Sequence, residues 1–188
     1  NLIYLGQEDI YNIDVQGFYW SRKTRQQQIL NNHYQGNGLE VPVIILAIEA
    51  AIDSYYILTE LRKVFASDGY NAYTIGMEPE CVLYGLEYMP EPMADYGVWK
   101  NFIESQVFYK QSDLVIWCIL LEDREKFLKV YPDCDAEISL CKEGENTVVE
   151  ITFEKEKTEK IISGLIARKD VDEIYHMIEA KLTEDEDG

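Results

Sequence analysis

The sequence predicts an α/β fold: a three-layer sandwich on a mostly parallel sheet of the P-loop or Rossmann type, with an antiparallel hairpin at one edge. Strand-like and helix-like segments alternate after residue 38, as they do in α/β proteins. Residues 43–48 and 114–121 are continuously apolar, which is typical of parallel strands covered on both faces. The predicted strands are residues 43–48, 70–76, 114–121, 137–141 and 147–153, the last two forming the hairpin.

Helices are expected where apolar residues recur three or four positions apart. The first begins at an N-cap, Asp53 or Ser54, and ends at Gly69, because glycine readily adopts the left-handed conformation that terminates helices. Asp170 with Glu173 three residues later resembles a capping box that opens the last helix. The predicted helices are residues 54–65, 98–109 and 125–130, one segment containing residues 161–166 and another containing residues 171–182, while residues 80–86 are a short helix or a loop.

Length and composition predict one main domain. The chain has 188 residues, of which 47% are hydrophobic, enough for one substantial core and too few for two ordinary domains. We expect residues 1–38 to be an N-terminal arm or the end of a preceding domain. Residues 39–183 then form the α/β domain, and residues 184–188 form a solvated acidic tail.

Charge and hydropathy exclude two classes of partner. A formal net charge of −18 would repel phosphates, so nucleic-acid binding is not expected. No apolar stretch approaches the ~18 to 20 residues that span a bilayer, so we expect a cytoplasmic protein without a membrane segment.

Cysteines and histidines form no recognisable site. The four cysteines fit no zinc-binding spacing, and Cys118 lies within an apolar run, so buried or incidental thiols are expected. Neither His33 nor His176 has a serine, cysteine or histidine partner at a diagnostic spacing. The sequence therefore predicts no catalytic residue, no metal ion and no cofactor.

The turn after the first strand bears most directly on function. In a nucleotide-binding unit this turn is rich in glycine and ends in Lys-Ser or Lys-Thr, whereas residues 49–53 read Glu-Ala-Ala-Ile-Asp. Glu49 and Asp53 would repel a phosphate, although backbone amides at the start of the helix, near Ser54, could attract an anion. We favour a structural turn with an N-cap over a ligand site at Glu49, Asp53 and Ser54.

Two further carboxylates, Glu122 and Asp123, end the strand at residues 114–121. Many nucleotide hydrolases hold magnesium through an acidic residue at such a position. Acidic residues are equally suited to beginning the helix at residues 125–130, which is the interpretation we favour.

Aromatic residues suggest an interaction surface. Tyrosine and tryptophan combine a large contact area with a polar tip, so exposed ones tend to mark interfaces. The chain has 14 tyrosines, and aromatic residues gather in the N-terminal arm. The candidate interface residues there are Tyr11, Phe18, Tyr19 and Trp20.

Several short motifs resemble accessory proteins of a clostridial peptide-maturation system, found beside small bacteriocin-like precursor peptides. The shared order is a Pro-Val-Ile strand at residues 42–44, a helix followed by Gly-Tyr at 69–70, an Ile-Gly strand end at 75–76, and Cys-Val-Leu-Tyr-Gly at 81–85, similar to the family's Cys-Glu-Leu-Phe-Gly motif. After Ile116 the chain departs from the family's glycine-containing strand end. The resemblance implies a P-loop-like scaffold with a degenerate Walker A loop, a role in making or handling a ribosomal peptide, and no catalytic residues to carry over.

The leading hypothesis is a non-catalytic accessory or binding protein in ribosomal peptide maturation, acting through protein or peptide contacts. An acidic surface suits a basic precursor peptide, and a modifying enzyme is the other expected partner. The alternative is a nucleotide-binding enzyme or switch that uses a non-standard loop at residues 49–54. A third hypothesis is a homo-oligomer formed through the arm.

Overall fold

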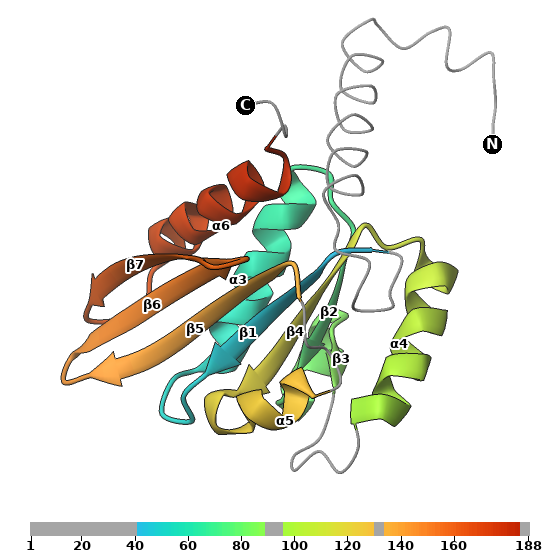
Figure 1. Cartoon of the computed structure of the whole chain (residues 1–188), viewed down its shortest axis with the longest axis horizontal. Helices are drawn as coiled ribbons and strands as arrows, with labels where there is room; N and C mark the ends of the chain where they lie inside the picture. Colours follow the sequence, from blue (N-terminus) through green and yellow to red (C-terminus); the bar gives the residue numbers. More distant parts are fainter. Residues whose placement is uncertain (1–40, 89–95, 130–133, 185–188) are drawn as a thin grey trace, which may run out of the picture.

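The computed structural model describes residues 41–88, 96–129 and 134–184, and of residues 96–101 it describes the backbone only. These residues form a seven-stranded sheet in the order β3-β2-β4-β1-β5-β6-β7 (Figure 1). The strands are β1 (Val43–Ile48), β2 (Ala72–Gly76), β3 (Glu87–Tyr88), β4 (Leu114–Leu120), β5 (Ala136–Glu143), β6 (Asn146–Phe153) and β7 (Glu156–Ser163). The helices are α3 (Ser54–Ser67), α4 (Tyr96–Lys110), α5 (Arg124–Leu128) and α6 (Arg168–Leu182), with short 3-10 helices η2 (Pro79–Tyr84) and η3 (Leu121–Asp123).

The sheet is parallel through its first five strands and antiparallel at one edge. β1 pairs in parallel with both β4 and β5, and β2 pairs in parallel with β3 and β4. β6 runs antiparallel to β5 and to β7. These pairings confirm the predicted α/β fold with a mostly parallel sheet and an antiparallel edge.

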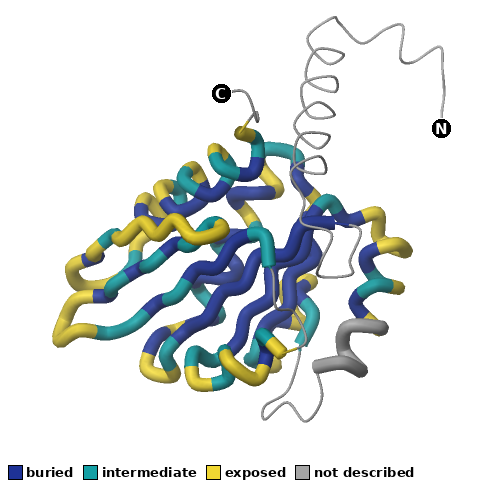
Figure 2. Tube along the Cα trace, in the orientation of Figure 1, coloured by how far each residue is buried: buried dark blue, intermediate teal, exposed yellow. Residues whose placement is uncertain are grey.

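β1 lies at the centre of the sheet and divides its side chains between two clusters. Because successive side chains of a strand point to opposite faces, Ile44, Leu46 and Ile48 join the cluster that contains the apolar sides of α3 and α6. The intervening residues of β1 join a second cluster with α4 and α5. All six residues of β1 are buried, which explains the continuous apolar run (Figure 2).

An aromatic pair lies within each of the two clusters. Phe65 of α3 packs edge to face against Tyr175 of α6, with ring centroids 4.7 Å apart. In the second cluster, Trp117 of β4 packs in the same manner against Phe127 of α5, at 4.8 Å. Such aromatic pairs add to the free energy gained by burial.

The prediction of a helix at residues 161–166 is wrong, because Ile161 and Ile162 belong to strand β7. A two-residue turn between Phe153 and Glu156 returns the chain alongside β6, so the antiparallel edge has three strands. Ile162 is buried under α6, while Ile161 is 58% exposed on the opposite face. The spacing of apolar residues fits a helix equally well, and the pairing with β6 decides the outcome.

The ends of α3 correspond closely to the predictions, whereas Asp170 has a different position in the last helix from the one predicted. Asp53 is the N-cap of α3, and Gly69 follows the helix with a φ of +90°. The last helix begins before Asp170, which is its third residue instead of its cap. The carboxylate of Asp170 accepts a 2.8 Å hydrogen bond from the backbone N–H of Ala167, the reciprocal half of a capping box.

Candidate functional site

The five predicted ligand-site residues lie along one edge of the sheet, where the parallel strands end. Glu49 directly follows β1, Asp53 and Ser54 open α3, and Glu122 and Asp123 lie in η3 directly after β4. Open α/β sheets usually place their ligands at this carboxyl edge. The contacts of each residue show what the edge can bind.

Contacts within the protein fill the turn after β1. The backbone N–H of Glu49 donates to the carbonyl of Leu140 at 3.0 Å, and its carboxylate accepts from the backbone N–H of Lys142 at 3.1 Å. Ile52 donates to the carbonyl of Glu49 at 2.9 Å and is buried in the core. The turn is therefore hydrogen-bonded to β5 and does not form an open phosphate-binding loop.

Carboxylates surround the N-terminus of α3. Asp53 accepts a 3.3 Å hydrogen bond from the backbone N–H of Tyr56. The hydroxyl of Ser54, which is 5% exposed, donates a 2.7 Å hydrogen bond to Glu78 in the loop after β2. Because a helix N-terminus carries partial positive charge, these acidic groups occupy the position that would otherwise attract an anion.

Glu122 and Asp123 precede α5, with Asp123 at its N-cap position but without a side-chain capping bond. Among the described residues, no hydrogen bond or ion pair joins them to Glu49, Asp53 or Ser54. Nor does the described part of the chain contain three histidine, cysteine or acidic residues grouped to hold a metal ion.

Arg124, which follows Asp123, forms a two-point ion pair with the sheet. Its guanidinium Nε and Nη2 both donate to the carboxylate of Glu137 in β5, Nη2 at 2.9 Å. Glu137 is only 8% exposed, and this two-point contact raises the pKa of Arg124. The contact ties α5 to the sheet.

The four cysteines are free thiols. Cys81 and Cys118 are buried, as expected for a thiol in an apolar run, while Cys134 and Cys141 are half-buried. Desolvation raises the pKa of each thiol, to about 12 for Cys134. A thiol with a raised pKa is a weak nucleophile at neutral pH.

A surface that the sequence did not single out lies beside this edge, on η2. Val82, Leu83 and Tyr84 are 60%, 81% and 52% exposed, and we call these three residues the η2 apolar row. The only buried residue of η2 is Cys81. The sequence signal was a run of four apolar residues between Glu80 and Gly85, too short to show which side chains are buried.

Tight contacts fix η2 against the sheet. Pro79 begins the 3-10 helix, and Gly85 ends it with a φ of +77°. A Cβ atom on Gly76 would lie only 2.4 Å from the Sγ atom of Cys81, so glycine at the end of β2 lets η2 approach this closely. Close packing against the end of β2 therefore holds the η2 apolar row in place.

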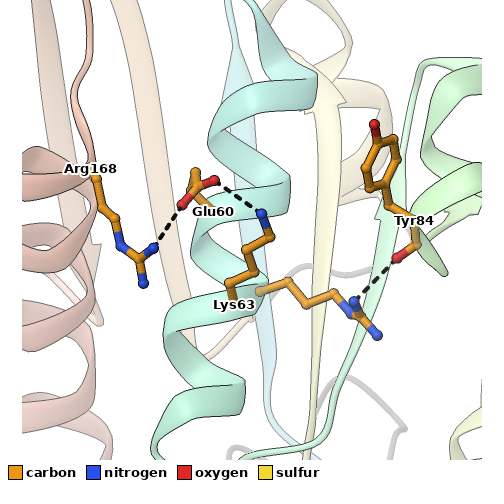
Figure 3. A network of polar contacts seen from close by, with 5 residues as sticks. Glu60, Lys63, Tyr84 and Arg168 are labelled. Carbon is orange, nitrogen blue, oxygen red and sulfur yellow. Dashed lines mark hydrogen bonds and ion pairs between the residues drawn. The ribbon is translucent and has the colours of Figure 1, made fainter.

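Helix α3 contacts Tyr84, the last residue of the η2 apolar row (Figure 3). Arg62 donates a 3.3 Å hydrogen bond to the carbonyl oxygen of Tyr84. Tyr55 packs edge to face against the Tyr84 ring at 5.4 Å, and burial together with a hydrogen bond to the Tyr84 side chain raises the pKa of Tyr55 to about 12. Glu60 of the same helix pairs with Lys63 at 3.4 Å and with Arg168 of α6 at 3.8 Å.

Two further groups of candidate residues are the aromatic residues of the N-terminal arm and the two histidines. Tyr11, Phe18, Tyr19, Trp20 and His33 lie outside the described residues. His176 is exposed on α6, with its ring 5.3 Å from that of Tyr175. No helix in the described ranges is long and apolar enough to cross a membrane.

The fold and the carboxyl ends of the parallel strands define the class of protein. It is an α/β protein with a mixed sheet, a closed turn after its first parallel strand and an exposed apolar row on η2. Searches of protein-family models, of curated proteins and of solved structures found no match to the chain.

Proposed function

We propose that the chain is a non-catalytic accessory or binding protein in ribosomal peptide maturation, acting through contacts with a protein or peptide. The observation that carries the proposal is the η2 apolar row. Three consecutive exposed apolar side chains are unfavourable on a surface that meets only water, and are typical of a surface that a partner covers. The motif that contains them, residues 81–85, is also part of the resemblance to peptide-maturation accessory proteins.

The rigidity of η2 supports a binding role. Cys81 is held against Gly76, and Arg62 fixes the Tyr84 carbonyl. A surface that is already ordered loses less conformational entropy when a partner binds, so more of the contact energy appears as affinity.

The charge around the row favours a basic partner. Glu78 and Glu80 lie on and beside η2, and the whole chain carries a net charge of −18. Acidic groups beside an apolar patch attract a segment that combines apolar and basic residues, and they raise its association rate. A basic precursor peptide, or a basic surface of its modifying enzyme, has this chemistry.

The same proposal describes the scaffold as a three-layer, P-loop-like fold whose phosphate loop has degenerated. It is supported by the two core clusters to which alternate residues of β1 contribute and by the position of α3 directly after β1. The rival function, a nucleotide-binding enzyme or switch, draws on the same position of α3. It is disfavoured because Asp53 and the Ser54–Glu78 hydrogen bond occupy the helix N-terminus.

Titration of the purified chain with partners encoded beside its gene tests the proposal. A fluorescently labelled precursor peptide, and separately the modifying enzyme, should give a saturable change in anisotropy with at least one of them. A scrambled peptide of the same composition serves as the control, because it keeps the charge and loses the order of apolar residues. Absence of saturable binding to both partners would remove the proposal.

A further inference from the structure

The last turn of α4 displays a second set of exposed apolar residues. The residues of α4 that are buried against the sheet are Ile103 and Val107. Phe108 is 79% exposed, and Tyr109 beside it is 84% exposed. Two large aromatic side chains therefore project from the end of this helix without cover from the described part of the chain.

These aromatic residues border an open depression of about 490 Å³, which we call the α4 depression. Val41 and Val107 form apolar parts of its wall and are each 7% exposed. Ser112 also lines it. Apolar walls beside two exposed aromatic rings suit an occupant that offers apolar and aromatic surface.

The position of Val41 points to the source of that occupant. Val41 lies in the wall of the α4 depression, and the residues that precede it are joined covalently to the chain at this point. The residues between Trp20 and Val41 could span as much as about 70 Å when extended, whereas a helix the length of α4 measures only about 22 Å. A segment around Trp20 can therefore return to the depression without strain.

We propose that Phe18, Tyr19 and Trp20, which we call the aromatic segment, dock in the α4 depression of the same chain. Aromatic rings pair favourably with other aromatic rings, and Phe108 and Tyr109 offer two of them. Because the segment is tethered, its effective concentration at the depression is high, and modest contact energy is enough to keep it bound.

The charges beside the aromatic segment fit the same arrangement. Arg22, Lys23 and Arg25 follow it closely, in a chain whose acidic residues outnumber its basic ones by 35 to 17. These basic side chains would be brought towards an acidic body, which is favourable at low and moderate salt.

Limited proteolysis of the full chain tests the docking, because the three basic residues are trypsin sites beside the aromatic segment. In the Phe108→Ser/Tyr109→Ser variant, cleavage at this cluster should become at least about fivefold faster, because the segment is released more often. Leu165→Ser is the matched control: it removes a 91%-exposed apolar side chain outside both surfaces and should leave the rate unchanged. Equal rates in all three proteins would overturn the proposal.

Two further measurements test the docking without the double variant, in case that variant folds poorly. Trp20→Ser, which lies outside the described core, should speed amide hydrogen exchange at Ser112, whose backbone N–H donates to Val107 in the wall of the depression. The tryptic rate of the unaltered chain should not depend on protein concentration. Protection that increases with concentration would overturn docking within one chain and assign the depression to a second copy.

Discussion

The hydroxyl of Ser54 donates a 2.7 Å hydrogen bond to the Oε1 atom of Glu78, and this bond joins the first turn of α3 to the loop after β2. Ser54 is almost completely buried, so the bond forms away from bulk water. It places a carboxylate at the helix N-terminus, next to the carboxylate of Asp53 that caps the helix. The position at which many open α/β sheets bind anions is thus occupied by the protein's own acidic groups.

Replacing Ser54 with alanine should destabilise the fold. The Ser54→Ala variant loses a hydrogen bond to a charged acceptor and leaves Glu78 with one partner fewer, which costs roughly 1.5–3 kcal/mol of the free energy of unfolding. Urea denaturation monitored by circular dichroism measures this loss. Ser67→Ala is the control, because within the described residues the Ser67 hydroxyl bonds to the carbonyl of Val64 in its own helix and should contribute much less. Equal losses in the two variants would contradict the structural role of the Ser54–Glu78 bond.

Gly76→Ala should destabilise the fold through a steric conflict. The new Cβ atom would lie 2.4 Å from Sγ of Cys81 and 2.9 Å from Cδ2 of Leu58, so these two side chains must move within a closely packed core. Overpacking of this kind costs about 1–3 kcal/mol. Part of that cost should disappear when Gly76→Ala is made in a Cys81→Ala background, because the closest atom is gone. Identical costs in both backgrounds, measured by chemical denaturation, would refute the close approach of η2 to β2.

Tyr175 should make stability sensitive to alkaline pH. Burial, followed by the hydrogen bond that its hydroxyl donates to Asp68, raises the pKa of Tyr175 far above its ordinary value. The folded state thus favours the neutral phenol, a contribution that is fully present below about pH 10 and is lost as the pH rises further. Tyr175→Phe should lose roughly 1–2 kcal/mol at pH 7 and decline less steeply above pH 10.

Urea unfolding between pH 7 and pH 11 measures both effects of the Tyr175 substitution. Tyr109→Phe is the control, because that side chain is 84% exposed. Curves for the unaltered protein and for Tyr175→Phe that remain parallel above pH 10 would show that Tyr175 does not titrate with folding.

Magnesium with ATP or GTP should leave the melting temperature within about 1 °C of its starting value. A ligand present at about 100 times its dissociation constant adds about 2.7 kcal/mol, which shifts the melting temperature of a domain this size by several degrees. Differential scanning fluorimetry at millimolar nucleotide therefore separates the two functions. A dose-dependent rise of several degrees would favour the nucleotide-binding alternative.

Much of the fold could be predicted from the sequence because its strands differ in pattern. Continuous apolar runs identified β1 and β4, since both faces of these strands are buried. Alternation identified β6, where Val149 and Ile151 point into the core. β7 was missed because Ile161 and Ile162 fit a helical pattern as well, and only their pairing with β6 distinguishes a strand.

The candidate site was less accessible to sequence reasoning. The turn at residues 49–53 was correctly placed after β1, and its departure from a phosphate loop was visible in its composition. The Ser54–Glu78 bond joins residues that are 24 positions apart, a contact that no local pattern encodes. Likewise, no local pattern separates buried Cys81 from exposed Val82 and Leu83, because their burial depends on how η2 packs against Gly76.

Paired titrations of the precursor peptide, or of its modifying enzyme, into three proteins test most directly whether the η2 apolar row is the binding surface. The proteins are the unaltered chain, Leu83→Ser and Leu165→Ser, in which the two leucines are 81% and 91% exposed and contribute little to the core. Binding to Leu83→Ser should be at least about tenfold weaker, because a central apolar anchor is lost, while Leu165→Ser should bind like the unaltered chain. Equal affinity for all three proteins, or no saturable binding to any of them, would contradict the proposed function.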